Sequence, residues 1–437
     1  MQMIMTAKST DSNRPPVRPR DRGRSPFFHG REEIIDTFNS VLEDSKVLND
    51  GTTFMIQGAP GAGKTALIDV LARRVADQGW KTAHIGTNTL WNPDDLLHRL
   101  GKKTSTRIKG ASVEAGVDKD VKASALLSVE ILPVVLTMIK ILEDDKKSLL
   151  LILDEAQALG LKDMVPAEMK DNVTDVLKQI HNGDLGRPVM FLAGGLGTTE
   201  VALSMFGVSR FEGDCKVYLD RLDKASERAV IHDWLTYAGG APRDTPTWID
   251  AIAEHTYGWP QHIISYVKPA VKYLGANEHQ MSDEGLDFVL ANGEEARLEY
   301  YDSRVHDIDE HEREILARAV MDVPTDGTKT GPTIISILKK SGLTQKEADD
   351  LFTQALDQGI IDKRKGGRYG IPIPSMHSWL IDEHIGNKSQ DIQHPPKSLP
   401  IRTEPLSPQP TWEDQERMKK DKGEDKRKGR GGFSMER

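Results

Sequence analysis

The sequence predicts an α/β fold whose mostly parallel sheet carries a phosphate-binding loop. Three observations lead to this prediction. Residues 58–65, GAPGAGKT, fit the pattern G-x-x-x-x-G-K-[ST] without a mismatch. The apolar run at residues 149–153 ends directly in Asp154 and Glu155, as a buried central strand does at the edge of a sheet. Strand and helix patterns alternate along this part of the chain, which is typical of parallel strands covered by helices on both faces.

The elements around the glycine-rich loop follow one another in the expected order. An apolar helical stripe at residues 34–42 precedes the β-prone stretch 53–57, and residues 66–78 repeat apolar side chains at four-residue spacing. Residues 81–85 read as a second strand. A strand that feeds a glycine-rich turn and a helix points several backbone N–H groups at one place, where the helix dipole adds positive potential. We therefore expect the phosphates of a nucleoside triphosphate to contact this loop, through Gly58, Ala59, Pro60, Gly61, Ala62, Gly63, Lys64 and Thr65.

Four side chains are expected to supply the chemistry. Lys64 would reach the β- and γ-phosphates, and the Thr65 hydroxyl would ligate Mg²⁺. Asp154 would hold the same ion from the opposite side. Glu155 would orient and deprotonate the attacking water. The alternative for Glu155 is the start of a solvated loop, but the two carboxylates beside a complete phosphate loop predict hydrolysis and not only binding.

The remaining segments of this domain are less sharply defined. Residues 101–122 alternate between apolar and polar side chains and contain glycine turns, which predicts an inserted β-hairpin. This hairpin would be either a surface for contact with a partner or an insertion without a role. A helix around residues 173–180 is followed by a strand at residues 188–193. Thr198 and Thr199 come after that strand and are candidates to contact the γ-phosphate or the lytic water. The glycines that precede them leave the register open.

The two ends of the 437-residue chain differ in composition from its middle. Residues 1–24 form a proline-containing basic segment, and residues 387–437 are highly charged with little apolar periodicity, so we predict a disordered basic arm and a disordered charged tail. Without these ends, 40 basic and 56 acidic residues remain. Such an acidic balance argues against a general nucleic-acid-binding surface.

The cysteine count and hydropathy indicate a reducing compartment. Cys215 is the one cysteine, which excludes an internal disulfide and a cysteine-based zinc site. No signal-peptide pattern is visible, and the longest apolar run, residues 131–139, is too short to span a bilayer. We therefore expect a cytoplasmic protein without membrane contact.

With these motifs in place, the sequence resembles the AAA+ P-loop ATPases. The resemblance is to the branch that holds origin-recognition initiators, transposon-associated ATPases and STAND signalling switches. Residues 28–32, with Gly30 and Arg31, are similar to the branch's box that packs beside the adenine. The glycine-rich loop and the acidic motif match as well, and residues 218–239 look like the start of its helical lid.

Two further segments bear on how fast such a site would hydrolyse ATP. Residues 209–211 are similar to the family's arginine-finger segment, which implies a homo-oligomer in which Arg210 reaches the γ-phosphate of a neighbouring subunit. The alternative is a surface arginine in an intramolecular salt bridge. The lid departs from the family pattern Gly-x-Pro-Arg, because Gln261 stands where the arginine is usual. His262 could supply a charge only when protonated, although STAND switches use a histidine in this neighbourhood.

The C-terminal part predicts a small winged helix. Three helical patterns, at residues 312–321, 332–340 and 344–358, precede a basic hairpin at residues 360–371. The third helix is acidic, which opposes DNA reading, whereas the hairpin carries a net charge of +3 and could grip a DNA backbone. A protein-contact or autoinhibitory module is the alternative.

The resemblance implies an AAA+ nucleotide-binding domain at residues 25–222, a helical lid at 223–305 and a winged helix at 306–386. It implies a Mg·ATP-dependent ATPase that acts as a nucleotide-dependent switch. The expected partners are DNA, through the wing and the basic ends, and either a second copy or a partner protein. Its role would then be that of an initiator, a loader or a transposition-type regulator. The alternatives are a STAND-type signalling ATPase with slow turnover and an adaptor with structural nucleotide.

Overall fold

The computed structural model describes Pro19 and residues 26–100, 148–211, 214–323, 325, 327 and 329–385. All of them belong to one compact unit. The predicted hairpin near residues 101–122 and the predicted disordered arm and tail lie outside the described residues, apart from Pro19.

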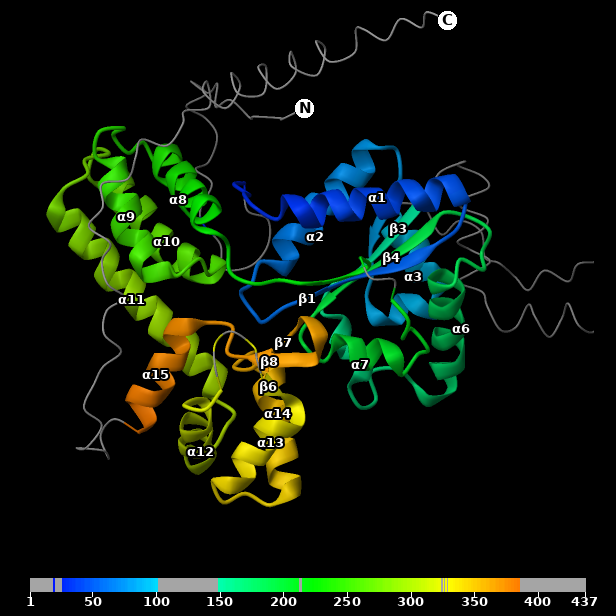
Figure 1. Cartoon of the computed structure of the whole chain (residues 1–437). Helices are drawn as coiled ribbons and strands as arrows, with labels where there is room; N and C mark the ends of the chain where they lie inside the picture. Colours follow the sequence, from blue (N-terminus) through cyan, green and yellow to red (C-terminus); the bar gives the residue numbers. More distant parts are fainter. Residues whose placement is uncertain are drawn as a thin grey trace, which may run out of the picture. The chain divides into compact units, whose positions relative to one another are not determined.

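A five-stranded parallel sheet forms the centre of the α/β domain, as predicted (Figure 1). Its strand order is β2-β3-β4-β1-β5. Successive residues of the central strands belong to different buried clusters, since Leu150 and Ile152 pack with one and Leu149 and Leu151 with the other. Both faces of the sheet are therefore covered. The strands are β1 (Thr52–Gln57), β2 (Lys81–His84), β3 (Leu149–Leu153), β4 (Val189–Gly195) and β5 (Lys216–Tyr218).

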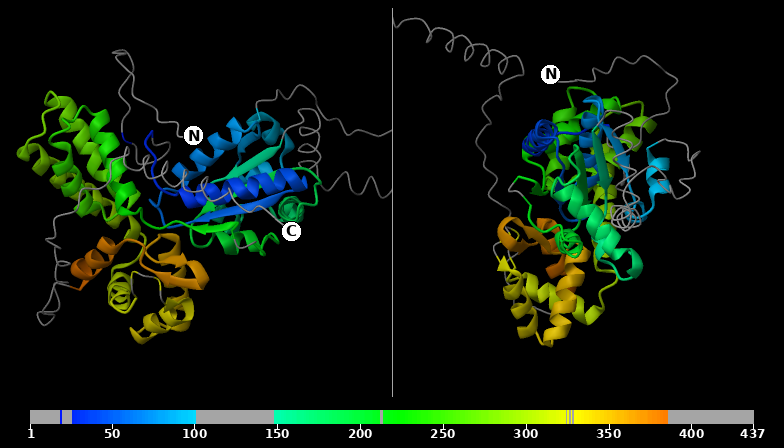
Figure 2. Two further views of the ribbon diagram at one scale, coloured as in Figure 1. Left: turned by 45° about the horizontal axis from the view of Figure 1, so that its top comes forward. Right: turned by 90° about the vertical axis from the view of Figure 1, so that its right-hand side faces the viewer.

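Amphipathic helices cover the two faces. Helix α1 buries Phe38 and Leu42 on one face, and α6 buries Val176 and Leu177 on the other. The side view in Figure 2 shows α1 on one side of the strands and α3 and α6 on the opposite side. The helices of this domain are α1 (Glu32–Leu48), α2 (Lys64–Asp77), α3 (Pro93–Arg99), α6 (Lys170–His181) and α7 (Thr199–Ser204), with 3-10 turns η1 (Thr87–Leu90), η2 (Ala156–Gly160) and η3 (Ala167–Met169).

A four-helix lid with its own buried cluster follows the sheet. Glu227 ties it together, because its buried carboxylate accepts hydrogen bonds from the Thr256 hydroxyl and the Gly258 N–H. Gly258 immediately precedes the segment that reaches the phosphate loop. The lid helices are α8 (Lys224–Tyr237), α9 (Thr245–Thr256), α10 (Pro260–Ala276) and α11 (Asp283–Val305).

The C-terminal module, residues 310–385, contains three helices, a three-stranded antiparallel sheet of order β6-β8-β7 and a last helix. Its buried residues Leu351 and Ile371 belong to the same apolar cluster as Leu67 and Leu71 of α2. The module therefore packs continuously with the α/β domain. Its elements are α12 (Glu310–Val320), β6 (Lys329–Thr330), α13 (Gly331–Lys340), α14 (Gln345–Asp357), β7 (Asp362–Arg364), η4 (Lys365–Gly367), β8 (Arg368–Gly370) and α15 (Pro374–His384). We call residues 362–370 the wing hairpin.

Candidate functional site

The glycine-rich loop joins the end of β1 to the start of α2, where the sequence placed it. Gly61 and Gly63 have φ angles of +80° and +91°, in the left-handed region that favours glycine. A Cβ atom on Gly61 would lie 2.7 Å from the Cβ atom of Gln261 in the lid. The loop conformation and its close contact with the lid therefore both require glycine at this position.

Lys64 opens α2 and is buried beneath the loop. Its Nζ donates to the carbonyl oxygens of Gly58 at 2.8 Å and Ala59 at 3.1 Å. Burial lowers the pKa of Lys64, while the carboxylates of Glu155, Asp362 and Asp154 raise it. A cation and three carboxylates thus converge at the phosphate loop, although one of these carboxylates, Asp362, comes from the C-terminal module.

The two predicted magnesium ligands lie side by side. The Thr65 hydroxyl donates to Asp154 Oδ2 at 2.7 Å, and the Glu155 N–H donates to Asp154 Oδ1 at 3.0 Å. A hydroxyl and a carboxylate fit Mg²⁺, which keeps several waters and binds substrate phosphates rather than an all-protein cage. No group of three or more His, Cys, Asp or Glu side chains suited to a metal occurs in the part of the chain that the structure describes.

Glu155 follows Asp154 with a positive φ of +56°, a conformation uncommon for residues other than glycine. Such backbone outliers concentrate at functional sites. Its Oε2 accepts a hydrogen bond of 2.6 Å from Nε2 of Gln157, a residue to which sequence reasoning assigned no role. The Oε1 of Gln157 in turn accepts a hydrogen bond of 3.2 Å from the Leu196 N–H.

The two threonines after β4 have different environments. The Thr198 hydroxyl donates to Asp357 Oδ1 of α14 at 3.0 Å. The Thr199 side chain is fully buried, and its hydroxyl has no hydrogen-bond partner within the described residues. Thr198, the residue that precedes α7, therefore contacts the C-terminal module.

Gly30 and Arg31 lie where the chain enters the lid. The Arg31 guanidinium donates to the main-chain carbonyl oxygens of Asp220 and Arg221. Gly30 has a φ of +78°, and a Cβ atom there would lie 2.8 Å from Ser226 Oγ of α8. The two residues join the start of α1 to the segment that connects β5 with the lid.

The first turn of α10 reaches the phosphate loop, since the Gln261 N–H donates to the Gly61 carbonyl oxygen at 3.2 Å. His262 does not face the loop in the same way. It is fully buried, with its ring centroid 5.8 Å from that of Tyr300 and 5.4 Å from that of Tyr301. Burial and the charge of Arg297 lower its pKa to about 3, so His262 is neutral at physiological pH and provides no positive charge.

A different arginine, Arg304 at the end of α11, carries positive charge toward this region. Its guanidinium lies over the Tyr300 ring, 4.7 Å from the centroid, and the Tyr300 hydroxyl donates to the Pro60 carbonyl oxygen at 2.7 Å. The Arg304 charge lowers the pKa of Lys64. Its Nε is buried and has no acceptor among the described residues. No sequence motif marks Arg304, because only the packing of α11 brings it to the loop.

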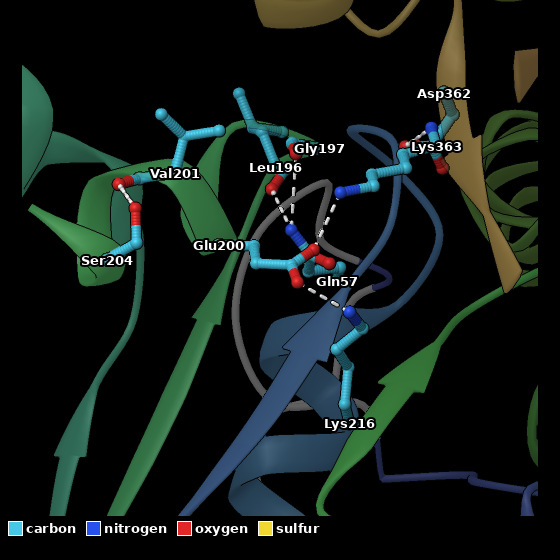
Figure 3. A network of polar contacts seen from close by, with 9 residues as sticks. All are labelled: Gln57, Leu196, Gly197, Glu200, Val201, Ser204, Lys216, Asp362 and Lys363. Atoms are coloured by element: carbon cyan, nitrogen blue, oxygen red, sulfur yellow. Dashed lines mark hydrogen bonds and ion pairs between the residues drawn. The ribbon is translucent and has the colours of Figure 1, made fainter. Parts of the chain in front are cut away.

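The wing hairpin docks on the α/β domain. Asp362, fully buried, accepts the Ala59 N–H at 2.9 Å through Oδ2 and the Lys363 N–H at 2.8 Å through Oδ1. Lys363 pairs with Glu200 at 2.6 Å. Figure 3 shows Lys363 and Lys216 both reaching the Glu200 carboxylate. Arg364 pairs with Asp220, also at 2.6 Å. Two of the hairpin cations that could grip a DNA backbone are thus paired inside the chain.

This docking is expected to weaken as pH rises. Burial raises the pKa of Asp362 from 3.8 to about 6, against the opposing effects of Arg364 and Lys64. Because the docked state binds the proton more tightly, its stabilisation is complete below about pH 4 and is lost as pH rises to about 6, on the order of 3 kcal/mol. The difference in the free energy of unfolding between wild type and Asp362→Asn should therefore change by this amount between about pH 4 and about pH 8. An equal difference at both pH values would show that this carboxyl does not control docking.

Arg210 is exposed, and within the described residues its side chain takes part in no ion pair. It follows α7, on the same connection that leads from β4 to β5. The intramolecular salt bridge considered as the alternative is therefore not formed between described residues.

Comparison with known proteins identifies the fold. No family model and no curated protein matches the sequence. A Walker-type ATPase of Pyrococcus abyssi is similar in structure, with a TM-score of 0.53 and 15% identity over 83% of this chain and 98% of that chain. The ORC2 protein of Aeropyrum pernix in its ADP form gives a TM-score of 0.52 and 16% identity over 83% and 97% of the two chains. Its ADPNP–ADP complexes give 0.50 and 17% over 86% and 96%.

These likenesses show the predicted fold class, an α/β fold on a five-stranded parallel sheet, which this chain shares with the Walker-type ATPase and the ORC2 protein. They extend over most of the chain. The helices that the structure describes include none with the length and hydropathy needed to cross a membrane.

Proposed function

We propose that this chain is a Mg·ATP-dependent AAA+ ATPase that works as a nucleotide-dependent switch. The observation that carries the proposal is the convergence of Lys64, Thr65, Asp154 and Glu155 at one glycine-rich loop. The neighbouring ORC2 structures are described with ADP and ADPNP, which supports an adenine nucleotide as the ligand.

Each residue has a defined role in this proposal. Backbone N–H groups of residues 58–65 and Lys64 bind the phosphates, with Gly30 and Arg31 on the adenine side. Thr65 and Asp154 would hold Mg²⁺, which would offset the negative charge of the phosphates. Glu155 orients and deprotonates the attacking water. Arg210 completes the site of a neighbouring copy.

In this proposal the lid supplies positive charge to the phosphates through a residue that no sequence motif marks. Gln261 cannot carry a positive charge, and the neutral His262 does not carry one. Arg304 is the candidate, because its guanidinium lies above Tyr300, which is bonded to the loop at Pro60. A buried guanidinium nitrogen without an acceptor is costly, and a phosphate oxygen would satisfy it.

The docked wing is the proposed off state of the switch. Asp362, Lys363 and Arg364 form one hydrogen bond and two ion pairs to the nucleotide-binding domain. In this state the charges of Lys363 and Arg364 are not available to DNA. DNA association as an initiator, loader or transposition-type regulator then requires release of the wing. A STAND-type signalling switch with slow turnover is the second candidate, and the docked wing favours it.

Release of the wing without loss of its charges separates these candidates. Glu200→Gln together with Asp220→Asn removes both acidic partners and leaves Lys363 and Arg364 in place. If the wing grips DNA, the double variant should bind duplex DNA about tenfold more tightly than wild type at low salt, and added salt should abolish the gain. Glu168→Gln with Asp287→Asn, which removes the same charge at other exposed positions, is the control.

Each candidate function predicts a different result, and a third result would contradict both. Tighter DNA binding by the released variant alone supports the DNA-associated role. ATP hydrolysis that increases in the released variant without any DNA binding supports the signalling switch. Equal hydrolysis and equal DNA binding in all three proteins would contradict a switch that operates through the wing.

A further inference from the structure

Gln157 connects the predicted water-activating residue to the turn between β4 and α7. Its side-chain amide donates to Glu155 Oε2 at 2.6 Å, and its carbonyl oxygen accepts the Leu196 N–H at 3.2 Å. A single side chain therefore bridges two segments that lie at the tips of neighbouring strands β3 and β4. Glu155 cannot change its orientation freely while both bonds are intact.

The close approach of Gln157 to β4 depends on Gly195. A Cβ atom at that position would lie 2.4 Å from Gln157 Oε1 and 2.1 Å from Thr199 Oγ1. Any larger residue would displace the bridging side chain. The glycine at the end of this strand thus makes room for the contact.

The turn that Gln157 contacts is held from two further sides. From β1, the Gln57 amide donates to the carbonyl oxygens of Leu196 and Gly197, each at 3.2 Å (Figure 3). From the C-terminal module, Asp357 accepts the Thr198 hydroxyl, and Lys363 pairs with Glu200 on the first turn of α7. The wing and the water-activating residue are therefore both tied to the same short segment, residues 196–200.

We propose that Gln157 is a positioning residue through which docking of the wing restrains Glu155. The inference rests on the proposed ATPase function. In the docked state the wing fixes the turn, the turn fixes Gln157, and the amide of Gln157 occupies one oxygen of the Glu155 carboxylate. An oxygen that accepts a short hydrogen bond is less available to accept a proton from water. Release of the wing loosens the turn, frees this oxygen and raises turnover.

A double-mutant cycle tests the coupling, because spatial continuity alone does not demonstrate it. The single-turnover rate of Mg·ATP hydrolysis is measured for wild type, Lys363→Glu, Gln157→Met and the double variant. Lys363→Glu faces Glu200 with a like charge and should undock the wing. We expect each single variant to raise the rate by about tenfold, the lower end of what a hydrogen bond to a charged group contributes. The double variant should be no faster than Gln157→Met alone.

Controls separate this coupling from general damage. Lys346→Glu makes the same charge change at an exposed position of α14 and should leave the rate unchanged. Gln157→Asn keeps the amide but shortens its reach, and it takes the place of Gln157→Met in the cycle if that variant folds poorly. The KM for ATP and the thermal midpoint of each variant are measured alongside the rate.

Two results would overturn the inference. One is an effect of Lys363→Glu that is equally large in the wild-type and the Gln157→Met backgrounds, which would show that Gln157 carries no coupling. The other is a rate that falls in Gln157→Met at unchanged KM, which would show that the amide assists Glu155 instead of restraining it. Failure of the proposed function itself is distinguishable, because wild type would then hydrolyse ATP no faster than Glu155→Gln.

Discussion

Glu155→Gln is expected to slow ATP hydrolysis by about 10²–10⁴-fold while ATP binding is retained. The carboxylate lies close enough to Lys64 to raise its pKa, which places it at the phosphate end of the predicted site. An amide has nearly the same shape but cannot accept the proton of the attacking water. Single-turnover phosphate release and equilibrium binding of a fluorescent ATP analogue measure the two effects separately.

Glu168→Gln is the matched control for this prediction. Glu168 is exposed in η3 of the same domain, so its substitution should leave both measurements unchanged. A Glu155→Gln variant that hydrolyses ATP at the wild-type rate would show that Glu155 belongs to a solvated loop.

Arg210→Ala is expected to lower turnover by about 10³–10⁵-fold, the range measured where an arginine stabilises charge on the transferring phosphate. The side chain is exposed, as an arginine that acts on a neighbouring subunit should be. ATP affinity of the isolated subunit should not change. Turnover as a function of protein concentration is the measurement, since a site shared between copies becomes active only on assembly.

Mixing separates action in trans from a local effect. Equal amounts of Arg210→Ala and Glu155→Gln subunits should regain part of the activity, because some shared sites then combine an intact Glu155 with an intact Arg210. Arg243→Ala, an exposed arginine in the lid, serves as the control and should behave as wild type. Mixed subunits that remain inactive, with a wild type whose rate is independent of concentration, would contradict the shared site.

The sequence predicted those parts of the site that are encoded locally. The loop, the helix that begins at Lys64 and the strand that ends just before Asp154 each follow from short patterns, and parallel pairing of β3, β4 and β1 brings Asp154 to Thr65. The three C-terminal helices and the hairpin were likewise placed within two residues of their observed ends.

The remaining contacts depend on packing between segments that are far apart in sequence. Ala59 and Asp362 are 303 residues apart, and Gln157 and Leu196 are 39 apart. The local pattern around Asp362 indicates only a charged hairpin, so its burial against the phosphate loop could not be predicted. The same reason applies to His262, whose low pKa results from its buried position beside Tyr300 and Tyr301 and not from its neighbours in sequence.

The central claim, that the loop at residues 58–65 binds ATP for hydrolysis, is tested most directly by phosphate release from Mg·ATP with purified wild type and Lys64→Ala. Lys64 is the cation beneath the loop, and its removal leaves the β- and γ-phosphates without their main counter-charge. We predict measurable release by wild type and none by Lys64→Ala at the same protein concentration. Equal release by the two proteins, or none by either across the concentrations at which wild type assembles, would contradict the account.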